Sequence, residues 1–193
     1  YQKIPKSSEF YGDAQFAAGS EYWNRFIDRA SVDSPDPEEL VELLESAYRH
    51  LEVAVNRMDS GDETTAEQLS IAKLTLAKIA DRLSRPADVL EWIEGGPNPL
   101  LEQIQTTASG KRSSNGGVTQ STVLSLLYHA KERTGDAEGA QQALQQLASL
   151  PDSLQPDELQ RLVLRVAKTE LKTTLAKPEV TDADVERLSG LFS

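Results

Sequence analysis

The sequence predicts an all-α protein built from antiparallel helical hairpins. Three observations favour this fold class. Leucine and alanine dominate the apolar residues, aromatic residues make up only 6% of the chain, and no period-two alternation bounded by turn residues occurs. Apolar residues instead recur every three or four positions, which is the spacing of one face of an α-helix. Short breaks separate the helical segments, as is typical of antiparallel neighbours.

The first two helices are expected at 14–30 and 37–59. The second has a clear start, because Asp36 can cap the N-terminus and Pro37 suits the first helical position. The acidic residues that follow favour the positive end of the helix dipole. The remaining helical segments are expected, in order, at 64–83, 87–94, 100–105, 118–133, 137–150, 157–176 and 181–191.

These segments group into one predicted helical-repeat domain over 1–193. Its hairpin units lie at roughly 14–59, 64–94 and 118–150, and its C-terminal helices lie within 157–191. Residues 106–117 contain no apolar residue larger than alanine, so we expect a flexible loop there.

Composition excludes several classes of function. The chain carries 20 Lys and Arg against 31 Asp and Glu, a formal net charge of −11, so it is an acidic protein whose field repels phosphate. We therefore expect no nucleic-acid partner. No apolar run approaches the ~20 residues that a bilayer requires, so no direct membrane insertion is expected either. The absence of cysteine excludes disulfides and thiolate chemistry. Because the chain starts at Tyr1 and its one methionine is Met58, we expect a piece of a longer protein.

Two hairpins match each other in sequence at an offset of 51 residues. In each, a helix of about four turns leads into a three-residue turn and then into a second helix with paired apolar positions. Leu76, Ser84, Val89 and Ile93 correspond in this way to Leu127, Gly135, Ala140 and Leu144. A hairpin with apolar residues on both helices cannot bury them alone, which is why such units stack in arrays.

At these residues the chain resembles the tetratricopeptide-repeat (TPR) family. Segment 133–140 (RTGDAEGA) is similar to the family's turn, with Gly135, an acidic neighbour, and the small Ala140 five positions later. Pro151 stands one place before the family's closing proline. The resemblance implies hairpins stacked as a TPR-like α-α superhelix.

The resemblance weakens towards the N-terminus. In the preceding unit, Leu76 and Ala80 fit the first helix of a repeat, and Ser84 replaces the turn glycine. Segment 18–22 again places a small residue three positions before an aromatic one. The matched units lie about 50 residues apart rather than the family's ~34, so insertions or other helices intervene.

No catalytic or metal-binding pattern is complete. Segment 110–113 (GKRS) lacks the earlier glycine of a phosphate loop, and an arginine rather than Ser or Thr follows its lysine. Ser70 with Lys73 lacks the companion motifs of an acyl-transfer enzyme. Segment 59–63 lacks the alternating ligands of a calcium loop. His50 and His129 are far apart in sequence and have no partner at helical ligand spacing. We therefore expect neither an enzyme nor a cofactor.

The resemblance implies that the first helix of each hairpin lines a concave surface that holds a peptide. The positions that it assigns to this surface are Trp23, Asn24, Lys78, Asp81, Arg82, Ser125, His129, Glu132 and Arg133. Lys78, Arg82 and Arg133 would form a cationic strip suited to an acidic peptide or a C-terminal carboxylate. We expect a non-catalytic scaffold for protein–protein interaction. The alternative is a structural spacer or self-association domain, in which these residues are ordinary solvated side chains.

Overall fold

A computed structural model describes residues 4–58, 63–96, 99–102 and 119–150, together with a few single positions nearer the C-terminus. In these residues the regular secondary structure is helical and no strand occurs, which confirms the all-α prediction. The predicted loop over 106–117 lies outside the described residues. So do the predicted helices over 157–191, apart from helical backbone at positions 164, 171, 174 and 182.

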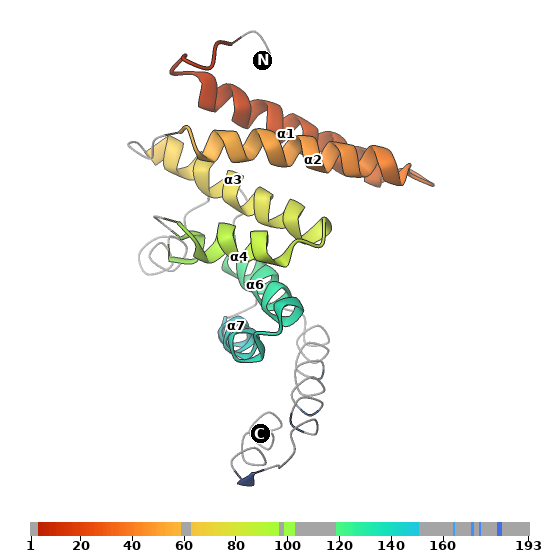
Figure 1. Ribbon diagram of the computed structural model, residues 1–193, viewed down its shortest axis with the longest axis vertical. Helices are drawn as coiled ribbons and strands as arrows, with labels where there is room; N and C mark the ends of the chain where they lie inside the picture. Colours follow the sequence, from red (N-terminus) through yellow and green to blue (C-terminus); the bar gives the residue numbers. More distant parts are fainter. Residues whose placement is uncertain are drawn as a thin grey trace. The chain divides into compact units, whose positions relative to one another are not determined.

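The chain forms two compact units, Tyr1–Thr119 and Gln120–Ser193. The first contains α1 (Tyr11–Ala30), α2 (Pro37–Val55), α3 (Glu63–Arg82) and α4 (Pro86–Glu94). The second contains α6 (Gln120–Thr134) and α7 (Ala137–Ser149). Within the first unit, α1 and α2 lie antiparallel, α3 packs beside α2, and α4 packs beside α3 (Figure 1). The single repeat domain over 1–193 stays a prediction. No helix in the described ranges is both long and apolar enough to cross a bilayer.

Helix α2 begins as its sequence predicts. An Oδ1 atom of Asp36 accepts the backbone N–H of Glu38 at 2.9 Å, and Pro37 stands at the first helical position. The helix ends at Val55, four residues earlier than expected, and the backbone N–H groups of Arg57 and Met58 both donate to the carbonyl of Ala54, at 3.0 Å and 2.9 Å. These bonds close the last turn of the helix.

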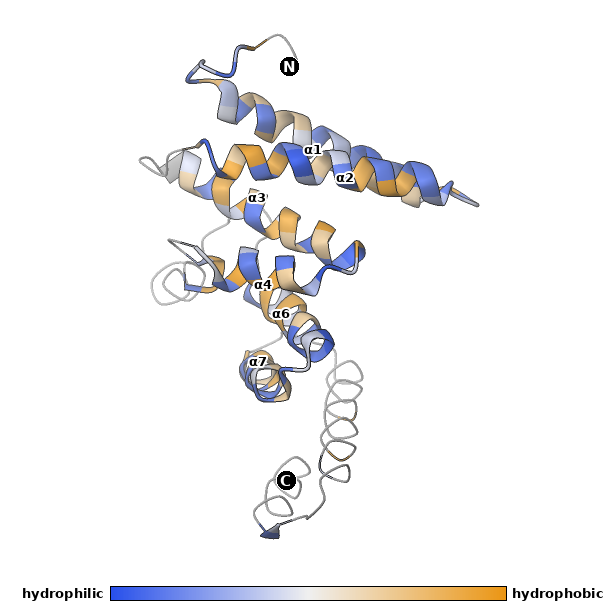
Figure 2. Ribbon diagram, in the orientation of Figure 1, coloured by the Kyte–Doolittle hydropathy of each residue, from blue (hydrophilic) through white to orange (hydrophobic). Residues whose placement is uncertain are grey.

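Helices α1 and α2 approach each other closely at Gly19. A Cβ atom placed on Gly19 would lie 2.6 Å from Leu51 Cγ and 3.0 Å from Leu51 N, so the two backbones can be this close only without a side chain. A Cβ on Gly12 would meet mainly the Met58 side chain, at 2.8 Å from Cγ. Every helix of the first unit carries both apolar and polar residues (Figure 2), as expected of helices that bury one face.

A polar network links α2 to α4. The indole N–H of Trp92 donates to the Tyr48 hydroxyl at 3.0 Å, and that hydroxyl donates to Asp88 Oδ2 at 3.4 Å. Arg85 pairs with Glu45 and lies over the Tyr48 ring, 5.7 Å from its centroid. Burial raises the pKa of the Tyr48 hydroxyl; the hydrogen bond from Trp92 opposes that rise and the Asp88 carboxylate adds to it. The network therefore holds the second hairpin against the first through neutral and charged contacts.

The two hairpins that match in sequence also match in structure. Ser84 and Gly135, which are 51 residues apart, both have left-handed backbone, with φ of 57° and 81°. The second helix of each hairpin then starts at the equivalent place, α4 at Pro86 and α7 at Ala137. Ser84 thus adopts the conformation for which a glycine is the usual choice.

The hydrogen bonds around these turns repeat at the same offset. The N–H of Arg85 donates to the carbonyl of Ala80 at 2.8 Å, and the N–H of Asp136 donates to the carbonyl of Lys131 at 2.9 Å. This six-to-one bond, together with a left-handed residue just before its donor, is a Schellman-type helix end. The residues that the sequence aligned across the two hairpins are also buried: Leu76, Val89 and Ile93 in one, and Leu127, Ala140 and Leu144 in the other. The internal repeat is therefore a repeat of backbone conformation as well as of sequence.

Candidate functional site

Five of the nine candidate residues lie in the first unit, on α1 and α3. Trp23 is half-buried and Asn24 is exposed, both in the second half of α1. Lys78 and Asp81 are half-buried and Arg82 is exposed, all in the last turns of α3. All the charged side chains among the five therefore lie at the end of α3.

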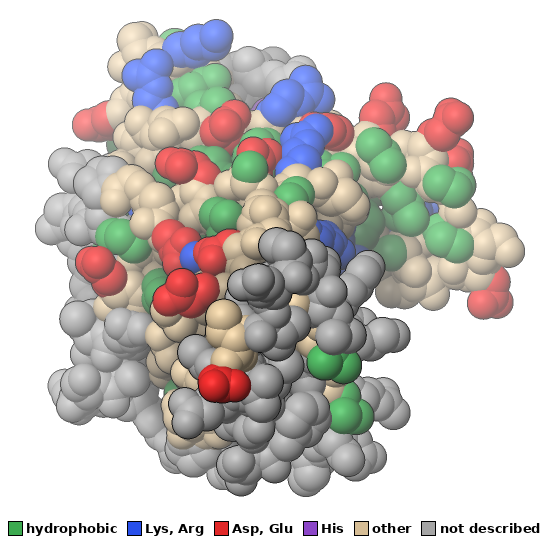
Figure 3. All heavy atoms as spheres, turned by 60° about the horizontal axis from the view of Figure 1, so that its bottom comes forward, with side chains coloured by type: hydrophobic (Ala, Val, Ile, Leu, Met, Phe, Trp, Pro, Cys, Tyr) green, Lys and Arg blue, Asp and Glu red, His purple; other side chains and the backbone are tan. Residues whose placement is uncertain are grey.

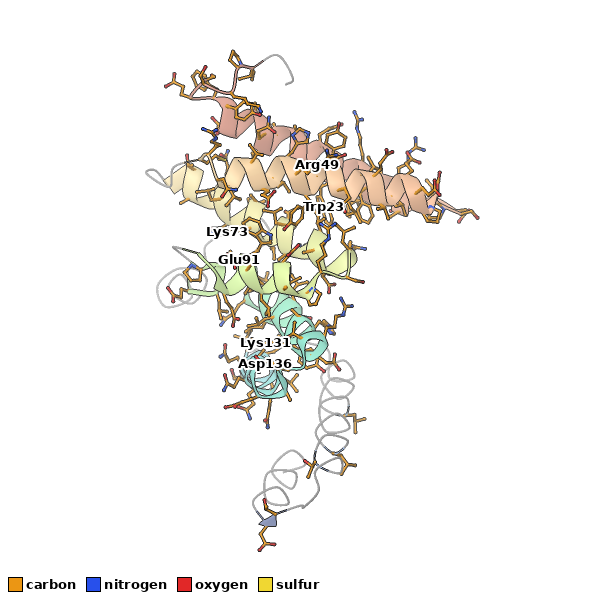
Figure 4. The ribbon with its side chains drawn as sticks, viewed as in Figure 1. Trp23, Arg49, Lys73, Glu91, Lys131 and Asp136 are labelled. Carbon is orange, nitrogen blue, oxygen red and sulfur yellow. The ribbon has the colours of Figure 1, made fainter. Side chains whose placement is uncertain are left out.

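The structure brings Arg82 and Trp23 together across α1 and α3. The guanidinium carbon of Arg82 lies 5.9 Å from the centroid of the Trp23 ring and 5.1 Å from that of Phe26. The two rings are themselves stacked, with centroids 5.4 Å apart. Trp23 lies near the C-terminal end of α3 in Figure 4. A guanidinium within about 6 Å of aromatic faces is held there by cation–π attraction. The two rings of α1 therefore hold the Arg82 guanidinium in place.

Lys78 lies one helical turn before Arg82 and adds a second positive charge. Burial lowers the pKa of the Lys78 ammonium, and the positive charge of Arg82 lowers it further. In the described part of the chain, no carboxylate forms an ion pair with Lys78 or Arg82. Two neighbouring positive charges therefore lie at this end of α3, and one of them is partly desolvated.

The other four candidates lie on α6, in the second unit. Ser125, His129 and Glu132 are half-buried and Arg133 is exposed. His129 Nδ1 lies 3.9 Å from Glu132 Oε2, and the His129 ring lies 5.0 Å from the ring of Tyr128. Arg133 was expected to join Lys78 and Arg82 in one strip. The pair that the structure describes together is Lys78 and Arg82, within the first unit.

Phe26 is not among the binding residues that the sequence predicted. It is buried, but its ring is the nearer of the two that hold Arg82. Its position three residues after Trp23 puts both rings on one side of α1, and that spacing was the signal available in the sequence.

The remaining polar groups have structural partners. The Nδ1 atom of His50 lies 2.6 Å from Gln15 Oε1, and its ring stacks on that of Tyr22 at 5.4 Å. His50 is thus part of the contact between α1 and α2. Over the described residues, no three His, Asp or Glu side chains gather as a metal ion would need. Comparison of the chain with family models, curated proteins and solved structures gave no match.

Proposed function

We propose that this chain is a non-catalytic, TPR-like scaffold module whose α1–α3 face binds an acidic segment of a partner protein. The observation that carries the proposal is the Arg82 guanidinium, which lies over two aromatic rings beside a second cation, Lys78.

This arrangement suits a carboxylate ligand. A guanidinium that lies over a ring still presents its N–H groups at its edge, and their planar fork matches the two oxygens of a carboxylate. The stacked contact with Trp23 and Phe26 fixes the side chain beforehand, so less conformational entropy is lost on binding. A carboxylate near Lys78 would also favour its charged form, which burial and Arg82 now disfavour.

The packing of the first unit supports the TPR-like part of the proposal. In stacked repeats, each hairpin contacts only its neighbours. Here the two hairpins pack mainly through α2 and α3, and single side-chain contacts also join α3 to α1, where Arg82 lies over Trp23, and α4 to α2, where Trp92 donates to Tyr48. The matched turns at Ser84 and Gly135 extend the likeness to the hairpin of α6 and α7, taken by itself.

Fluorescence anisotropy with a labelled peptide of aspartate and glutamate tests the proposal. Ionic strength near 0.15 M limits repulsion from the net charge of the chain, since the Debye length is then about 8 Å. We expect Arg82→Ala to weaken binding by at least about fivefold, or ~1 kcal/mol. Arg57→Ala is the matched control, because it removes the same charge from an exposed residue of the same unit.

Two outcomes would remove the proposal. One is the absence of saturable binding by the wild-type chain. The other is an equal loss of affinity for Arg82→Ala and Arg57→Ala, which would mean that the peptide responds only to overall charge. The chain would then be a structural spacer or a self-association domain. Light scattering distinguishes these two, because it measures whether the chain in solution has the mass of a monomer or of an oligomer.

A further inference from the structure

The end of the α1–α2 hairpin exposes three apolar side chains. We call residues 27–42 the hairpin tip; it comprises the last turn of α1, the connection over 31–36 and the first turns of α2. In the tip, Ile27 is 40% exposed, Val32 48% and Val41 50%. The tip extends beyond the end of α3 (Figure 1), and apolar and acidic side chains gather on it at the right of Figure 3.

Ile27 and Val41 lie on one side of the hairpin. Ile27 shares its helix face with Trp23, four residues earlier, which contacts Arg82 of α3. Val41 shares its face with Tyr48, seven residues later, which contacts Trp92 of α4. Both therefore lie on the side of the hairpin that carries α3 and α4, whereas Arg29 Nε and Glu39 Oε1, 3.1 Å apart, lie about 200° further round each helix. The tip therefore has a charged side and an apolar side.

The tip is also strongly acidic. It contains six carboxylates against one guanidinium, a net charge of −5. Five of the carboxylates are exposed and, among the described residues, form no ion pair: Asp28, Asp33, Asp36, Glu38 and Glu42. An apolar surface surrounded by unneutralised carboxylates favours a ligand with apolar groups and positive charges.

Local hydrogen bonds hold the tip in one conformation. The Ser31 hydroxyl donates to the Ile27 carbonyl at 2.8 Å, and the Val32 N–H donates to the Arg29 carbonyl at 3.3 Å. Asp36 caps α2 through its side chain. The backbone that carries the apolar side chains is thus ordered before any partner arrives, which lowers the entropy cost of binding.

We propose that the hairpin tip docks a basic amphipathic helix of a partner protein. The apolar face of that helix covers Ile27, Val32 and Val41, and its Lys and Arg side chains pair with the surrounding carboxylates. Charge selects this occupant. A second copy of the chain would bring another net charge of −5 to the same place, and an anionic membrane surface would also be repelled. The proposal does not depend on the binding of an acidic segment at Arg82.

The test uses the full chain and a short synthetic peptide of leucine and lysine in helical spacing, labelled for fluorescence anisotropy. We expect Ile27→Ser with Val41→Ser to weaken binding about tenfold. Phe10→Ser is the apolar control, because Phe10 is exposed at the other end of α1, and it should change affinity less than about twofold. Circular dichroism confirms that each variant is folded.

A second pair of variants tests the charges without altering apolar contacts. Asp33→Asn with Glu42→Gln should weaken binding about fivefold at low salt and reduce its dependence on salt. The control, Asp13→Asn with Glu91→Gln, removes two exposed carboxylates outside the tip. Equal effects of the two pairs would overturn the proposal, because the peptide would then bind the acidic chain without regard to place. Failure of the wild type to bind the peptide, or a dimer that Val41→Ser dissociates, would overturn it as well.

Discussion

Replacing Gly19 by alanine tests how closely α1 and α2 approach each other. The added Cβ would lie 2.6 Å from Leu51 Cγ and 3.0 Å from Leu51 N, where ordinary contacts begin at 3.4 Å. Leu51 is 1% exposed, so its side chain cannot turn into solvent. Relieving the contact with the backbone nitrogen alone requires the helices to separate by about 0.4 Å.

The size of the effect follows from two opposing contributions. Overpacking of a buried contact costs about 1–3 kcal/mol. Alanine in place of glycine inside a helix regains up to about 1 kcal/mol. Because a backbone atom and a buried side chain are both in the way, we expect the upper part of the first range. Gly19→Ala should therefore lower the free energy of unfolding by about 1–2 kcal/mol.

Gly12→Ala is the matched control on the same helix. Its Cβ would lie 2.8 Å from the Cγ of Met58, a flexible and half-buried side chain, and 3.4 Å from the backbone nitrogen of that residue. We expect a change between zero and a gain of about 1 kcal/mol. Urea denaturation followed by far-UV circular dichroism measures both variants. If Gly19→Ala proves as stable as Gly12→Ala, the close approach of α1 and α2 is wrong.

Three further predictions follow from single residues. Lys78→Met should leave the free energy of unfolding unchanged or raise it by up to about 1 kcal/mol, because it removes a partly desolvated charge beside Arg82. It should also weaken binding of the acidic peptide. A thermal melt measures the first effect and an anisotropy titration the second. Ser84→Gly should be neutral or stabilising and Gly135→Ser destabilising by about 1 kcal/mol, because both positions have positive φ; loss of stability in Ser84→Gly would contradict the matched turns. Burial lowers the pKa of His50, and the charge of Arg49 lowers it further. As the pH falls below about 6.5, His50 is therefore protonated more readily in the unfolded chain than in the folded one, and the free energy of unfolding decreases. Melting temperatures at pH 7.5 and 5.5 should differ less in His50→Gln, and an unchanged difference would show that His50 does not contribute.

The sequence predicted the helices well because each described helix has its own local signals. Asp36 and Pro37 mark the start of α2, and the turn residues around Ser84 and Gly135 mark the ends of α3 and α6. These signals act over a few residues, so a single sequence contains them in full. They also allowed the repeat to be recognised, because the same backbone turn requires similar residues at the same spacing.

Contacts between distant residues were predicted only in part. The placement of Arg82 and Trp23 on one face came from the resemblance to a repeat family, and the structure now shows them in contact. The link from Trp92 to Tyr48 was not expected, because it joins residues 44 positions apart and depends on how two helices cross. Periodicity reports which face of a helix is apolar but not which helix covers it. The exposed apolar side of the hairpin tip was missed for the same reason.

Locating a bound acidic peptide on the chain tests directly whether the α1–α3 face is the binding surface. A peptide of aspartate and glutamate with one photoreactive benzoylphenylalanine is irradiated with the full chain, and the crosslinked residues are identified by mass spectrometry. We expect crosslinks in the second half of α1, around Trp23, and at the end of α3, around Arg82. They should be lost in Arg82→Ala but not in Arg57→Ala. Crosslinks centred on Arg49 or Arg57, or spread evenly over the cationic residues, would contradict it.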